Sequence, residues 1–153
     1  MSNRCENPLN LAYAYLLGEV EPDQVAESAV ELIEAGFETE GVLLLANVHG
    51  ESNDRIEAVL RRVLRDHDYE WPAVADAGKW KANCIAREVL SGSLAPYDGA
   101  VRVVREVLRR VPSLNDLEVF KDLAEEYEDD IAHRSTYATR MREAFKALVE
   151  ANH

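Results

Sequence analysis

Gly18-Glu19-Val20-Glu21-Pro22 is the stretch that decides the fold, because it ends one helix and begins the next. Glycine readily adopts the left-handed backbone conformation found just after a helix, and proline is favoured at the first position of a helix. The same Gly-x-apolar-x-Pro pattern returns 74 residues later as Gly92-Ser93-Leu94-Ala95-Pro96. Each copy predicts a tight turn between two helices, one in each half of the chain.

The two halves also align beyond this turn, which suggests an internal repeat. Core positions of the following helix match at the same offset, as Ala26 matches Ala100. The offset becomes 78 where Leu45-Ala46 matches Leu123-Ala124, and 85 in the last helix of each half. It changes only where loops are expected, as loop drift after a duplication would produce. The alternative is that the two segments are unrelated, since any two amphipathic helices can be aligned so that their apolar positions coincide.

Apolar residues at helical spacing, separated by glycines, prolines and capping residues, predict about eight helices and very little strand. The expected helix starts are Pro8 after the cap Asn7, Pro22, Thr39, Ser52, residue 74, Pro96 and a capping box of Ser113 with Asp116, and the last helix ends near Asn152. The third helix is apolar nearly all round, so we expect it to be buried and to end near Gly50. Residues 69–73 connect the halves. The predicted fold class is all-α, a single domain over residues 1–153 with two tandem four-helix units in a helical-repeat-like bundle, its internal repeat covering 7–68 and 74–152.

Composition places the chain among globular proteins, since 47% of its 153 residues are apolar. No apolar run reaches the roughly 20 residues needed to cross a bilayer, so no membrane association is expected. The first ten residues lack the apolar segment of an export signal. Cys5 and Cys84 are too few for a disulfide framework, although a single disulfide between them is an alternative. We expect a cytoplasmic protein with two reduced thiols.

Negative charge is concentrated in the first half of the chain. The net charge is −12 overall. Residues 1–71 hold five Lys or Arg against fifteen Asp or Glu, which gives −10, and residues 72–153 hold twelve against fourteen, which gives −2. Such an excess repels phosphate backbones and argues against nucleic acid as a partner. It favours encounter with a basic protein, and the alternative is that acidity serves only solubility.

Two rows of like charge follow predicted helices. The expected partner-binding residues form an acidic row on the second helix and its flanks: Glu19, Glu21, Asp23, Glu27, Glu31, Glu34, Glu38 and Glu40. Like charges at this spacing repel one another by a few tenths of a kcal/mol per pair, so a row without basic residues favours a binding role over a merely solvated face. The second row is basic: Arg102, Arg105, Arg109 and Arg110. We expect it to form ion pairs with Glu118, Asp122 and Glu125 of the seventh helix.

Catalytic motifs are not recognisable in this sequence, and no catalytic residue, cofactor or metal is predicted. The glycines occur singly as helix stops, and neither cysteine lies in a nucleophile signature. One alternative remains open. Glu125, Asp129 and His133 are spaced to share one face of a helix and could supply ligands to a metal ion.

Residues Val89–Ala100, followed by Phe120, Leu123 and the acidic run Glu125–Asp130, resemble small all-helical bacterial proteins of uncharacterised families. Some of those families are immunity proteins found beside polymorphic toxins. The resemblance covers about 45 residues of the second half. It implies an immunity role and brings no catalytic residues with it.

The leading functional hypothesis is therefore a non-enzymatic, cytoplasmic binding protein, an acidic immunity-type inhibitor. Its acidic row would occlude a basic surface of a cognate toxin, such as a nuclease domain. A second hypothesis is a helical-repeat scaffold that binds a peptide or helix in the groove between the halves. A third is a metal-dependent helical enzyme that uses Glu125, Asp129 and His133.

Overall fold

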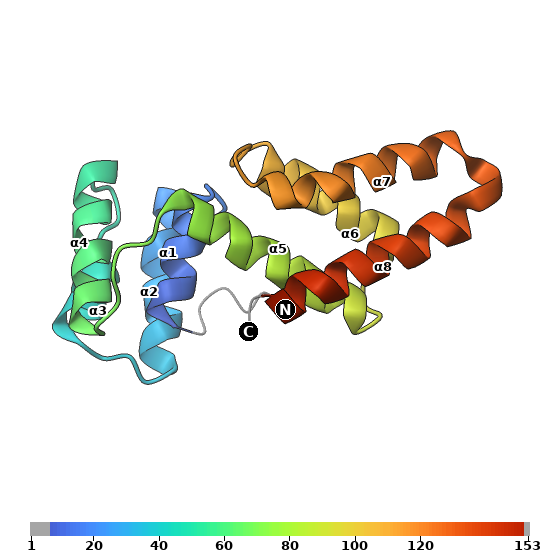
Figure 1. The fold of residues 1–153 in the computed structure, drawn as a ribbon. Coiled ribbons are helices and arrows are strands. Elements are labelled where there is room, and N and C mark those ends of the chain that lie inside the picture. Colours follow the sequence, from blue (N-terminus) through green and yellow to red (C-terminus); the bar gives the residue numbers. More distant parts are fainter. Residues whose placement is uncertain (1–6, 152–153) are drawn as a thin grey trace. The chain divides into compact units, whose positions relative to one another are not determined.

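The computed structural model describes residues 7–151, and these contain eight α-helices and no strand (Figure 1). The helices are α1 (Pro8–Leu16), α2 (Pro22–Glu34), α3 (Glu40–Leu45), α4 (Asn53–Asp66), α5 (Val74–Leu90), α6 (Pro96–Val103), α7 (Glu118–Asp129) and α8 (Arg134–Ala151). A π-helical segment, η1 (Val104–Leu108), continues α6, and two 3₁₀ turns, η2 (Asn115–Leu117) and η3 (Ile131–His133), precede α7 and α8. The predicted all-α class with eight helices is confirmed.

The chain divides into two compact units, with the boundary between Ala77 and Gly78 inside α5. The first unit contains α1 to α4 and the first turn of α5, and the second contains the rest of α5 and α6 to α8. The inferred duplication of 7–68 and 74–152 stays a prediction.

Three of the predicted helix starts are fixed by side-chain caps. The side chains of Asn7, Thr39 and Ser52 each accept a hydrogen bond from the backbone N–H three residues later, at 2.9, 3.4 and 3.3 Å. Such a cap satisfies one of the N–H groups that have no partner within the helix. These three sequence predictions are confirmed.

Both Gly-x-apolar-x-Pro turns end their helices in the same way. Gly18 and Gly92 have φ angles of 71° and 86°, in the left-handed region. The residue after each glycine donates its N–H to a carbonyl five residues back, at 2.9 Å in the first turn and 3.1 Å in the second. This bond is the signature of a Schellman motif, and the prolines at 22 and 96 then begin α2 and α6.

The core of the first unit is built on the apolar stripe of α4. Five α4 residues are buried: Ile56, Val59, Leu60, Val63 and Leu64. They belong to one cluster with buried side chains of α1, α2 and α3, among them Leu11, Leu32 and Leu45. This burial holds the first four helices together.

The expectation of a fully buried third helix is wrong. Helix α3 ends at Leu45, well before Gly50, and Leu43 is 48% exposed while Val42 and Leu45 are buried. A helix of six residues that packs on α4 through one face leaves its opposite face in solvent. The apolar residues on that face therefore do not indicate burial.

The core of the second unit centres on two phenylalanines. The rings of Phe120 in α7 and Phe145 in α8 stack with their centroids 4.3 Å apart, and both side chains are buried. Gly99 in α6 lies against this pair, since a Cβ at that position would come within 3.2 Å of the Phe145 ring. Close approach of α6 to α8 thus requires a residue without a side chain.

The π-helical segment η1 was not predicted, and it has a packing explanation. Val103, Val107 and Val111 are all buried, four residues apart. In a regular α-helix each four-residue step turns the side chain by about 40°, so a third such residue would drift out of line. The wider π turn, in which the Arg109 N–H donates to the Val104 carbonyl at 3.1 Å, removes this drift.

The predicted capping box of Ser113 and Asp116 is also wrong. Helix α7 begins at Glu118 after the 3₁₀ turn η2, and no side chain caps either element. Leu114 and Leu117 flank this turn and are both buried. Hydrophobic burial therefore sets the geometry of the turn, which displaces the helix start from Ser113.

Substitution of Gly92 by alanine tests the shared turn. A Cβ in the left-handed conformation costs about 1–2 kcal/mol, so Gly92→Ala should lower the free energy of unfolding by that amount. Gly92→Asn is the matched variant, because asparagine tolerates this conformation better, and it should lose less. Urea unfolding followed by circular dichroism measures both, and equal losses would contradict the argument.

Candidate functional site

The acidic α2 face, defined as Asp23, Glu27, Glu31 and Glu34, is exposed along its whole length. The opposite side of the same helix is buried in the core of the first unit: Val25, Ala26, Ala29 and Leu32. Burial of this apolar stripe fixes the rotation of α2 about its axis. The carboxylates therefore point to solvent because the rest of the helix must pack.

The structure divides the other four predicted partner-binding residues into two pairs. Glu21 and Glu38 are exposed on the segments that flank α2, Glu21 as its N-cap residue and Glu38 four residues after its last residue, beyond the left-handed Gly36. Glu19 is half-buried in the α1–α2 turn. Glu40 belongs to α3, and its carboxylate forms an ion pair with the Arg62 guanidinium of α4 at 3.3 Å. Glu19 and Glu40 are thus poorer candidates for an intermolecular contact.

The acidic α2 face is unpaired within the part of the chain that the structure describes. None of its four carboxylates forms an ion pair with a residue between 7 and 151. By contrast, the Glu57 carboxylate on α4 lies 3.4 Å from Nε of Arg61, four residues later. The charge of α2 is therefore available to a partner.

Val30 is an apolar residue within the acidic α2 face. Its side chain is 45% exposed. It stands three residues after Glu27 and four before Glu34, a spacing that puts all three on one side of the helix. This spacing could have revealed Val30 as an apolar surface residue ringed by carboxylates.

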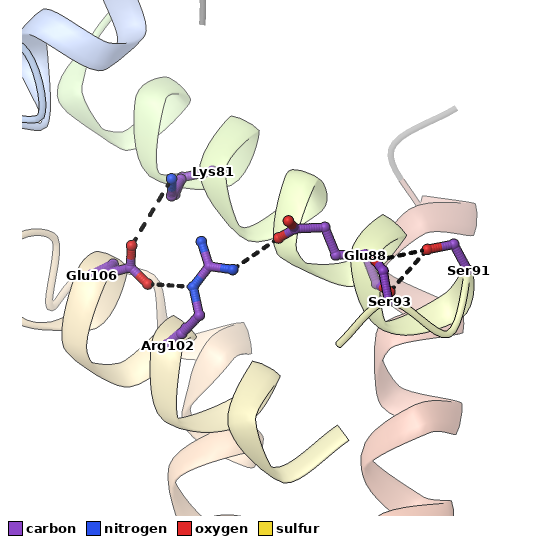
Figure 2. Close-up of polar contacts among 6 residues, drawn as sticks. All are labelled: Lys81, Glu88, Ser91, Ser93, Arg102 and Glu106. Atoms are coloured by element: carbon purple, nitrogen blue, oxygen red, sulfur yellow. Dashed lines mark hydrogen bonds and ion pairs between the residues drawn. The ribbon is translucent and has the colours of Figure 1, made fainter. Parts of the chain in front are cut away.

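The expected pairing of the basic row with α7 is wrong. Figure 2 shows that Arg102 instead binds two other glutamates, with Nε 2.7 Å from the Glu106 carboxylate and Nη1 2.8 Å from that of Glu88. Lys81 Nζ lies 3.9 Å from the other Glu106 oxygen and is only 16% exposed. The hydrogen bond to Glu106, followed by the charges of both glutamates, raises the pKa of Arg102. This network ties α5 to α6.

The α5–α6 turn at the end of the same network is held by hydroxyl groups (Figure 2). The Glu88 carbonyl accepts hydrogen bonds from the hydroxyls of Ser91 and Ser93, each at 3.0 Å. Arg142 of α8 donates to the Val89 and Leu90 carbonyls at 3.2 and 3.1 Å. The last carbonyls of α5 are thereby satisfied, so these polar groups have a structural role.

The proposed metal-ligand face of Glu125, Asp129 and His133 does not exist. Helix α7 ends at Asp129, and His133 belongs to the 3₁₀ turn η3. The His133 Nδ1 atom instead lies 2.9 Å from the Asp130 carboxylate. Among the described residues no group of three or more His, Cys, Asp or Glu side chains is arranged to hold a metal ion.

Asp130 is the centre of a small surface cluster at the α7–α8 turn. Its carboxylate accepts a hydrogen bond from the Tyr137 hydroxyl at 3.0 Å as well as the contact from His133. The contact with His133, and then the bond from Tyr137, lowers the pKa of Asp130 below its usual 3.8. The same bond raises the pKa of Tyr137 above 10.0.

Of the two cysteines, Cys5 lies outside the described residues, and Cys84 is half-buried on α5. No helix of the described residues is both long and apolar enough to cross a membrane. In comparisons with known proteins, no family model, no curated protein and no solved structure matched this chain.

The Asp130 cluster predicts a definite pH response. Because the pKa of Asp130 is lowered in the folded state, its contribution to stability is full above pH 3.8 and is lost as the pH falls through the folded-state pKa. Because the pKa of Tyr137 is raised, its contribution is full below pH 10.0 and is lost as the pH rises through the folded-state value. Carboxyl-carbon NMR titration of Tyr137→Phe should place the Asp130 pKa closer to 3.8 than in the wild type. An unchanged titration would show that the hydrogen bond does not form in solution.

Proposed function

We propose that this chain is a non-enzymatic binding protein whose acidic α2 face covers a basic surface of a partner protein. The partner in this proposal is a toxin with a positively charged active surface, such as a nuclease domain. The chain then acts as an immunity-type inhibitor of that toxin. Inhibition is steric and guided by charge, without chemistry on this chain.

The observation that carries the proposal is the unpaired state of the acidic α2 face. Four exposed carboxylates on one helix repel one another and have no basic partner among residues 7–151. Charge that is not used internally adds most to the rate of encounter with an oppositely charged surface. A basic protein surface supplies the missing counter-charges.

Val30 supports an interface over a purely solvated face. Interfaces commonly combine an apolar contact at the centre with polar or charged groups around it. The exposed Val30, between Glu27 and Glu34, reproduces this arrangement on a small scale. The partner then carries lysines or arginines around a small apolar contact.

Charge reversal on α2 tests the proposal. The triple variant Glu27→Lys, Glu31→Lys and Glu34→Lys should weaken partner binding by about tenfold to a hundredfold, since each exposed pair contributes roughly 0.2–1 kcal/mol. The partner is first captured from a lysate of the native host with the wild-type chain and identified. Its affinity is then measured by calorimetry at low and high salt.

The matched control is the triple variant Glu118→Lys, Asp122→Lys and Glu125→Lys on α7. These residues are exposed and have the same four- and three-residue spacing, so the change in net charge is identical. The control should retain most of the affinity. Equal losses in both variants would mean that net charge, and not the α2 face, determines binding.

A further inference from the structure

Three arginines of the second unit remain exposed and unpaired. The arginine patch, defined as Arg105, Arg109 and Arg110, forms no ion pair with any residue between 7 and 151. Arg102, the fourth member of the predicted basic row, is instead neutralised by Glu88 and Glu106. The patch is therefore the part of the row that is open to a ligand.

The three arginines lie within six residues of one another, in the π-helical segment η1 and in the turn that follows it. In a regular α-helix Arg110 would point about 140° away from Arg105. In η1 the hydrogen bonds run between residues five apart, as from the Arg109 N–H to the Val104 carbonyl at 3.1 Å. Arg109 therefore follows Arg105 by about one π turn, whereas the Arg110 N–H donates to the Val107 carbonyl at 3.1 Å in the turn that follows η1.

Guanidinium groups bind carboxylates and phosphates through paired hydrogen bonds. A row of protein carboxylates is favoured, and the chain itself carries one that is unpaired and exposed.

We propose that a second copy of this chain places its acidic α2 face on the arginine patch. This contact goes beyond the proposed function, because the arginine patch has no part in it. The contact joins exposed charged groups, and each such pair contributes little to the affinity. Association is then weak, favoured at low ionic strength and lost when salt screens the charges.

The experiment is sedimentation equilibrium of the purified chain in low salt, about 20 mM, and in high salt, about 0.5 M. The wild type should show a higher average mass in low salt and a monomer mass in high salt. The acid-reversed variant (Glu27→Lys, Glu31→Lys, Glu34→Lys) and the arginine-reversed variant (Arg105→Glu, Arg109→Glu, Arg110→Glu) should each stay monomeric in low salt.

Mixing the two reversed variants gives the decisive result. The introduced lysines of the acid-reversed variant can then face the introduced glutamates of the arginine-reversed variant. The native α2 glutamates of the second variant can likewise face the native arginines of the first, so the mixture should regain the higher mass. Regained mass also shows that both variants are folded. The control variant Lys79→Glu, Lys121→Glu and Lys146→Glu changes the charge of exposed residues elsewhere by the same amount and should associate like the wild type.

Three results would overturn the proposal: a monomeric wild type in low salt, reversed variants that associate like the wild type, or a mixture that stays monomeric. Failure of the proposed contact between two copies can be distinguished from failure of the proposed function. The arginine-reversed variant keeps the acidic α2 face and should bind a basic partner protein with unchanged affinity.

Discussion

The structure of each unit depends on the burial of apolar stripes between helices that are joined by very short turns. A helix that packs through one face cannot rotate about its axis without exposing that face. The Schellman motifs at Gly18 and Gly92 end one helix and let a proline begin the next only four residues later. These two constraints fix both the direction and the rotation of α2 and α6, and with them the placement of every charge on those helices.

The exposed charges follow from this constraint, since they lie wherever packing does not need the surface. On α2 the result is a row of exposed carboxylates that form no ion pair with any residue between 7 and 151. On α6 and η1 the need to keep Val103, Val107 and Val111 in one line introduces the π turn. Arg102, in α6 just before this segment, is engaged by two glutamates, whereas Arg105, within it, forms no ion pair with a described residue. The basic row is thus divided into a structural part and an open part.

Much of the fold could be predicted because hydrophobic periodicity and capping are local signals. The stripes of α2 and α4, the caps at Asn7, Thr39 and Ser52, and the break between helices at 69–73 all belong to this class. The boundary between the two units was not predicted, since it lies between Ala77 and Gly78 inside α5. The π turn could not be predicted, because it depends on which neighbours Val111 meets in space. The exposure of Leu43 depends likewise on how few helices pack around α3.

The candidate site, like the fold, could be predicted where it depends on spacing within one helix. It could not be predicted where it depends on contacts between helices. The acidic row follows from helical spacing alone, and its exposure follows from the burial of the opposite stripe. The pairing of Glu40 with Arg62 and of Arg102 with Glu88 joins residues on different helices, which spacing within one helix cannot reveal. The loss of the metal-ligand hypothesis has a local cause, since the helix ends at Asp129 and His133 turns back to Asp130.

The two rows of like charge illustrate how packing and binding compete for the same residues. On α4, Glu57 forms an ion pair with Arg61 and Asp66 forms one with Arg62, so these charges are neutralised within the helix. On α2 no basic residue is available, and each carboxylate adds to the repulsion felt by the next. That repulsion is tolerated because the buried stripe of the same helix stabilises the fold by far more than a few tenths of a kcal/mol per pair. A counter-charge brought by another molecule would relieve the repulsion, and this gain makes α2, and not α4, the surface that favours association.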